Sequence, residues 1–101
     1  MDRVATFQSF IARSPRDPFP RYGLAMELRS RGDLAAAWQT FEALLAEFPA
    51  YVPAYLMAGQ TLVALGRRED AASVYRTGID HAAASGNAHA RGELEGALAE
   101  L

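Results

Sequence analysis

The sequence repeats at an interval of 34 residues, and this interval limits the chain to a few architectures. A shift by 34 positions aligns residues of the same kind: Leu28 with Leu62, Gly32 with Gly66, Ala37 with Ala71 and Phe41 with Tyr75. The same shift towards the N-terminus aligns Phe41 with Phe7 and Pro49 with Pro15. A fixed interval of about 20 to 50 residues is typical of stacked repeats, in which each unit buries its apolar face against the next.

Each unit has the pattern of two helices. Apolar residues recur at helical spacing before each repeated glycine and again after it, as in Leu24, Ala25 and Leu28, then Ala37, Phe41 and Leu45. Gly32 and Gly66 stand where a helix ends in the left-handed conformation, which glycine adopts at least cost. Proline cannot continue a helix, so Pro15 and Pro49 each close a unit.

The pattern therefore predicts an all-α protein of about six helices. Asp17 before Pro18 is typical of a helix cap followed by a first-turn proline, and Pro53 also suits a first turn. No segment alternates with a period of two for long enough to form a strand. The expected helices lie near residues 2–13, 18–30, 34–47, 52–65, 68–84 and 88–100. The helix after Gly66 should be longer than the helix after Gly32, because no proline ends it near residue 83.

Small residues recur where the two helices of a unit meet. We expect Ala25 and Gly59 to face Ala37 and Ala71, so that the helix axes approach closely. Phe41 and Tyr75 should be buried beside them at equivalent places. Hairpins of this kind stack because none buries its apolar face alone.

These residues resemble the tetratricopeptide repeat family, and in particular its small bacterial members. The first full unit supplies Leu24, Ala25, Leu28, Gly32, Ala37, Phe41 and Pro49 of the family pattern. The second supplies Tyr55, Gly59, Leu62, Gly66, Ala71, Tyr75 and Gly78. The chain departs from the pattern at Arg21, Ala58, Leu44 and Ala83. The resemblance covers nearly the whole chain and implies a right-handed α-solenoid of antiparallel helix pairs.

A chain of 101 residues is the size of one domain. We expect residues 1–15 to form a half-repeat helix, 18–51 repeat one, 52–85 repeat two and 86–101 a displaced C-terminal capping helix. The strict interval fails in the last segment, since its apolar stripe consists of Ala90, Leu94, Ala97, Leu98 and Leu101.

Composition excludes several classes of function. The chain has no cysteine, which rules out thiolate metal sites and thiol catalysis, and its net charge of −2 argues against nucleic-acid binding. No apolar run approaches the roughly 20 residues that span a bilayer, so we expect a cytoplasmic protein without membrane contact. His81 and His89, separated by Gly86 and Asn87, are expected to be exposed and to bind no metal. No acid–base or nucleophile constellation appears, so the sequence predicts neither an enzyme nor a cofactor.

A candidate binding surface lies on the first helices. Tyr22, Met26 and Arg29 share one helical face, and 34 residues later Leu56, Gln60 and Val63 do the same. In the resembled family this face lines a concave groove that receives peptides. The Lys and Asn clamp of its chaperone-binding members is missing, because Tyr22 and Met26 stand in its place.

The sequence therefore predicts an adaptor or scaffold that binds a peptide or helix of another protein. Tyr22, Met26, Leu56 and Val63 would provide apolar contacts, and Arg29 and Gln60 would fix orientation, with Arg29 suiting an acidic residue of the partner. These side chains could equally pack against a terminal helix. Two rival hypotheses are a weak homo-oligomer without a separate ligand and, ranked lower, an RNA-binding helical repeat.

Overall fold

The computed structural model describes residues 2–101 and contains helices only over that range. The helices are α1 (Arg3–Arg13), α2 (Pro18–Ser30), α3 (Leu34–Glu47), α4 (Pro53–Ala64), α5 (Arg68–Ala84) and α6 (Ala88–Ala99). The all-α prediction is confirmed, and each boundary lies within one residue of the expected one. With 17 residues, α5 is longer than α3, which has 14.

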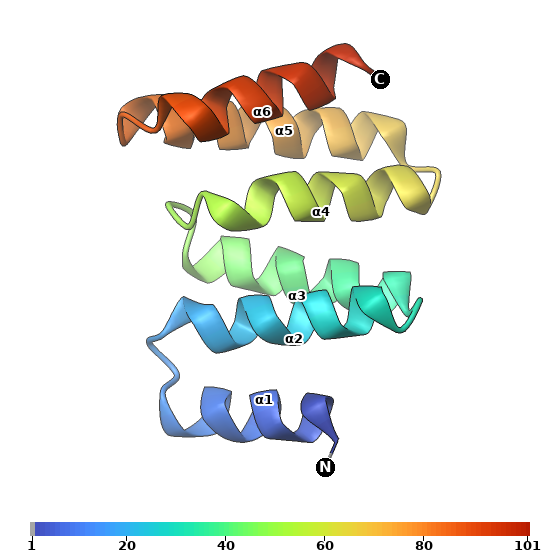
Figure 1. Ribbon diagram of the computed structural model, residues 1–101, viewed down its shortest axis with the longest axis vertical. Coiled ribbons are helices and arrows are strands. Elements are labelled where there is room, and N and C mark those ends of the chain that lie inside the picture. Colours follow the sequence, from blue (N-terminus) through green and yellow to red (C-terminus); the bar gives the residue numbers. More distant parts are fainter. Residues whose placement is uncertain (1) are drawn as a thin grey trace.

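The six helices stack in chain order along the longest dimension of the molecule, which measures 39 × 29 × 19 Å (Figure 1). Helices α2, α4 and α6 lie on the near side in this view, with α3 and α5 behind them. Each helix packs against the next one in the chain, and α4 also contacts both α2 and α6. The near helices therefore form a continuous row that presents one face of each unit.

Glycine ends a helix at three turns. Gly32 and Gly66 have φ angles of 82° and 78°, which confirms the left-handed conformation predicted for them. Gly86 has a φ of 71° and plays the same part between α5 and α6. Residues with a β-carbon rarely adopt a positive φ, so the chain reverses direction at these three glycines.

The N-terminal helix is attached to α2 through charged groups. The Asp2 carboxylate accepts a hydrogen bond of 3.1 Å from the Val4 amide, so Asp2 is the N-cap of α1. The same oxygen lies 2.7 Å from the Arg31 guanidinium, and Arg31 also pairs with Glu27 at 3.2 Å. The hydrogen bond from Arg31, with that from Val4, holds the pKa of Asp2 below its ordinary range. The beginning of α1 and the end of α2 are thus joined.

Two contiguous clusters form the core. One contains Ala25, Ala37, Phe41, Leu44, Ala54 and Ala58; the other contains Val52, Tyr55, Leu62, Ala71, Tyr75, Ala82 and Leu94. Phe41 is fully buried and Tyr75 is 2% exposed, which confirms the burial predicted for this pair. Trp38 packs against both clusters, and the Arg67 guanidinium lies 5.6 Å from its ring. The two units consequently share one apolar interior.

Glycines also allow aromatic rings to approach helix backbones. The sequence predicts that Gly59 faces Ala71. In the structure, the three atoms nearest to a β-carbon added at Gly59 all belong to the ring of Tyr75 on α5. Gly78 in turn lies against Tyr55 and Leu94, where an added β-carbon would be 2.6 Å from the Tyr55 β-carbon. At both glycines, a tyrosine of the neighbouring helix occupies the space that a side chain would need.

Arg21 occupies the position at which a bulky apolar residue is usual. Its side chain is 22% exposed, its guanidinium lies 5.9 Å from the Phe48 ring, and it pairs with Glu47 at 3.3 Å. The same group donates a hydrogen bond to the Pro15 carbonyl oxygen. The aliphatic stem of an arginine covers apolar surface while its charged end stays near water, so Arg21 fills the space of a bulky residue.

Helix α6 continues the row of near helices and does not cover it. Leu94 is buried, and the other predicted stripe residues pack against the second cluster: Ala90, Ala97, Leu98 and Leu101. The expected apolar stripe is therefore confirmed. Within residues 2–101, no helix has both the length and the apolar character needed to cross a membrane.

Candidate functional site

The six residues predicted to form the groove lie on two adjacent helices. Tyr22, Met26 and Arg29 come from α2, and Leu56, Gln60 and Val63 come from α4. We call these six residues the inner strip. The Arg29 guanidinium donates a hydrogen bond of 3.3 Å to the side-chain oxygen of Gln60, so the two rows meet at this pair.

The strip is half-buried rather than fully open. Val63 is 40% exposed, whereas Tyr22, Met26 and Leu56 are partly buried against the core clusters. The Tyr22 ring lies 6.2 Å from the Phe41 ring and 5.8 Å from the Tyr51 ring, measured between centroids. Burial raises the pKa of the Tyr22 hydroxyl, and the charge of Arg29 acts in the opposite direction. These side chains therefore contribute to packing and also face the surface.

Helix α6 adds a second wall to the strip, which produces two clefts. The first cleft, of about 230 Å³, is lined by Tyr22, Val52, Pro53, Leu56, Met57, Ala90, Glu93 and Leu94. The second cleft, of about 210 Å³, is lined by Gln60, Val63, Tyr75, Ala97, Glu100 and Leu101. Five of the six strip residues line a cleft or bond to one that does, and α6 supplies the facing side.

Glu93 and Glu100 are the charged side chains lining the clefts, and neither was among the predicted site residues. They are seven positions apart, Glu93 within α6 and Glu100 at its C-cap, so they lie on one helical face, and this spacing can be read from the sequence. Burial is the main cause of the raised pKa of the Tyr75 hydroxyl, Glu100 raises it further, and Arg29 lowers it. Charges of opposite sign, on Glu100 and Arg29, therefore act on the Tyr75 hydroxyl in the second cleft.

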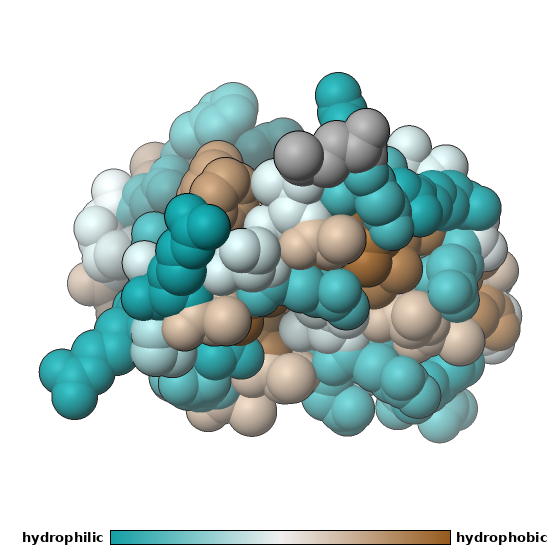
Figure 2. Space-filling model, turned by 90° about the horizontal axis from the view of Figure 1, so that it is seen from below, coloured by the Kyte–Doolittle hydropathy of each residue, from teal (hydrophilic) through white to brown (hydrophobic). Residues whose placement is uncertain are grey.

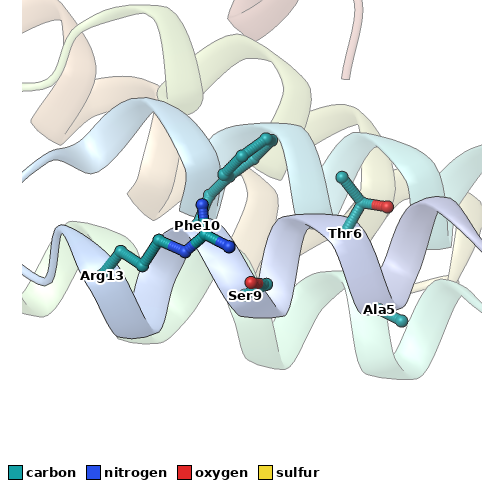
Figure 3. A pocket seen from close by; sticks show the side chains of 5 residues that line it. All are labelled: Ala5, Thr6, Ser9, Phe10 and Arg13. Carbon is teal, nitrogen blue, oxygen red and sulfur yellow. The ribbon is translucent and has the colours of Figure 1, made fainter.

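A larger hollow of about 420 Å³ lies along α1 (Figure 3). Its lining residues, Ala5, Thr6, Ser9, Phe10 and Arg13, all come from this one helix. Seen from that end, the surface is mainly hydrophilic with scattered hydrophobic areas (Figure 2). A hollow with a single helical wall encloses a ligand less well than the clefts between α4 and α6.

The histidines show no metal-site geometry. His81 was expected to be exposed, and this prediction was wrong: its ring is half-buried and stacks on Tyr55 with centroids 5.7 Å apart. The long α5 brings His81 over α4, which explains the difference. His89 is exposed and lies 3.2 Å from Glu93. Among residues 2–101, no three metal-binding side chains come together.

Comparisons with known proteins agree with this architecture. The family model described as tetratricopeptide repeat matches residues 28–91. A tetratricopeptide repeat domain protein from Salinibacter ruber, in its crystal structure, is 34% identical with a TM-score of 0.79, over 84% of this chain and 94% of that one. The solution structure of such a protein from the same organism gives 35% identity and a TM-score of 0.81, over 85% and 87% of the two chains.

A solution structure from Bordetella parapertussis shares the fold at 22% identity, with a TM-score of 0.82 over 99% of this chain and 87% of that one. No protein with a curated description is significantly similar to this chain. The repeated residues, the helix stack, the family match and the identities above 30% lead to one conclusion: the chain belongs to the tetratricopeptide repeat family.

Proposed function

We propose that the protein is an adaptor that binds a segment of another protein in the groove formed by the inner strip and α6. The tetratricopeptide repeat fold is an interaction architecture whose stacked helices create concave binding surfaces, and the family is generally non-enzymatic. Its site of action would be the cytoplasm, and residues 1–101 would act as one binding domain composed of the two repeats and their terminal helices.

The observation that carries this proposal is the pair of clefts that lie along α4 and α6. Apolar side chains from different helices line both clefts, so apolar groups of a segment bound between α4 and α6 would be removed from water. Val63 and Leu56 would supply apolar anchors, and the Arg29–Gln60 pair would offer hydrogen-bonding groups at a fixed place. The contact is small, so we expect an affinity on the order of micromolar or weaker.

A homo-oligomer is the second candidate, because Phe10, Phe19 and Val63 leave apolar surface exposed at separate places. Sedimentation at several concentrations separates the two hypotheses: self-association would appear without any added ligand. RNA binding ranks lower, since the charged side chains that line the clefts are carboxylates, which repel phosphate.

The test is a peptide-display selection with the purified protein, followed by binding measurements on the selected peptides. Val63→Arg places a charge in the second cleft at an exposed position, so we expect the helical fold to persist and peptide binding to fall at least tenfold. Phe19→Arg is the matched control, because Phe19 is 62% exposed and lines neither cleft. Unchanged binding by the Val63→Arg variant would place the binding surface outside the groove.

Val63 is a better test position than Tyr22 or Leu56. Tyr22 contacts two core rings, so its replacement by alanine would weaken packing together with any ligand contact. A circular dichroism spectrum of each variant, with its thermal midpoint, shows whether the fold is preserved.

A further inference from the structure

The charged side chains that line the two clefts are both carboxylates. Glu93 lines the first cleft and Glu100 the second, and the remaining lining residues of both clefts are uncharged. We infer that the groove selects a basic protein segment, one with apolar side chains between two cationic residues. This inference rests on the proposed function and specifies the chemistry of its partner.

The spacing of the two glutamates sets the spacing of the cations. Glu100 continues the helical backbone of α6, so the two residues are seven helical positions apart and about 10 Å apart along the axis. They also lie on the same helical face, within about 20°. A partner helix with basic residues seven positions apart matches this distance, as does an extended polyproline-type segment with basic residues three positions apart.

Apolar side chains line both clefts beside the two carboxylates. Leu56 from α4 and Leu94 from α6 line the first cleft, and Val63 and Ala97 line the second. A segment with leucine-like side chains between its cations would therefore cover apolar floor while each cation meets a carboxylate. Charges in a cleft bounded by apolar walls interact more strongly than charges in open water.

Arg29 does not reverse this preference. It lines neither cleft, and although its positive charge lowers the pKa of the Tyr75 hydroxyl in the second cleft, Glu100 has the larger and opposite effect on the same pKa. Glu100 forms no ion pair within residues 2–101, and Glu93 lies 3.2 Å from the exposed His89 side chain on its own helix. The acidic partner residue expected from Arg29 alone is therefore disfavoured.

The experiment compares two fluorescent helical peptides of equal length. The basic probe has two arginines seven positions apart with two leucines between them on the same face, and the acidic probe has glutamates in place of the arginines. Anisotropy titrations measure the affinity of each probe for the whole protein at low and at high salt. We expect the basic probe to bind roughly 3- to 10-fold more tightly, with the difference shrinking as salt rises.

The variant Glu93→Gln with Glu100→Gln should abolish this preference while keeping the apolar groove. The control Glu69→Gln with Asp80→Asn changes the net charge equally at exposed positions of α5 and should keep the preference. Equal binding of both probes, tighter binding of the acidic probe, a preference that survives the Glu93 and Glu100 changes, or no binding of either probe would overturn the inference.

These outcomes are distinguishable from failure of the proposed function. If Val63→Arg still removes binding of display-selected peptides, the groove is the binding surface even when charge selection fails. If Val63→Arg leaves that binding unchanged, the groove itself is wrong.

Discussion

Gly59 on α4 lies directly against the ring of Tyr75 on α5, so closely that a β-carbon at position 59 would overlap the ring. Tyr75 is 2% exposed. This contact fixes how closely α4 and α5 approach. The effect of this contact on stability can be measured, because the chain also contains helical glycines at which an added β-carbon would meet no neighbouring atom.

Gly59→Ala should lower the free energy of unfolding by about 1–2 kcal/mol in urea titrations. Overpacking a filled core costs about 1–3 kcal/mol, and the higher helix propensity of alanine returns up to about 1 kcal/mol. Gly92→Ala is the matched control, since nothing lies within 4 Å of its added carbon. That variant should gain up to about 1 kcal/mol. A Gly59→Ala protein as stable as the Gly92→Ala protein would contradict the close contact.

Phe41→Ala should cost roughly 3–5 kcal/mol of unfolding free energy, because it removes a fully buried ring and leaves a cavity. That is a large share of the stability of a domain of this size. Phe19→Ala, at a position 62% exposed, should change stability by no more than about 0.5 kcal/mol. Chemical denaturation of both variants checks the pair, and similar losses would contradict the burial of Phe41 in the core.

Ala37→Leu should destabilise by about 1–3 kcal/mol, because Ala37 is fully buried among Ala25, Phe41 and their neighbours. Ala43→Leu on the same helix is exposed and should be nearly neutral. The comparison by thermal unfolding separates side-chain volume in the core from helix propensity. An Ala37→Leu protein with unchanged stability would show that the helices of the first unit tolerate a wider separation.

Arg31→Gln should raise the pKa of Asp2 towards its ordinary value, because Arg31 is the main cause of the depression. A carboxyl whose pKa is depressed by folding stabilises the protein above its unfolded pKa, and this contribution is lost as pH falls through the folded pKa. The variant should therefore show a smaller stability loss on acidification. An NMR titration of the Asp2 carboxyl carbon measures the shift, and an unchanged midpoint would argue against the Asp2–Arg31 pair in solution.

Local signals predicted most of the fold. Gly32, Gly66 and Pro53 determine where helices end or begin through backbone preferences that act within a few residues. The repeat then aligned Phe41 with Tyr75, which identified equivalent core positions without any knowledge of the packing.

Contacts between segments distant in the sequence were harder to predict. His81 was misjudged because its stacking on Tyr55 depends on how the extended α5 crosses α4. Glu93 and Glu100 were missed because α6 breaks the interval, so no repeated counterpart placed these two carboxylates beside α4. The inner strip itself followed from helical spacing, whereas its facing wall required the three-dimensional arrangement.

Trp38, the one tryptophan of the chain, lies where the two core clusters meet. Its fluorescence is therefore an intrinsic reporter of the junction between the units, while far-ultraviolet dichroism reports total helix. If the terminal helices fray before the centre melts, the dichroism signal will decline at lower temperature than the fluorescence signal. Coincident curves would mean that the whole solenoid unfolds in a single cooperative step.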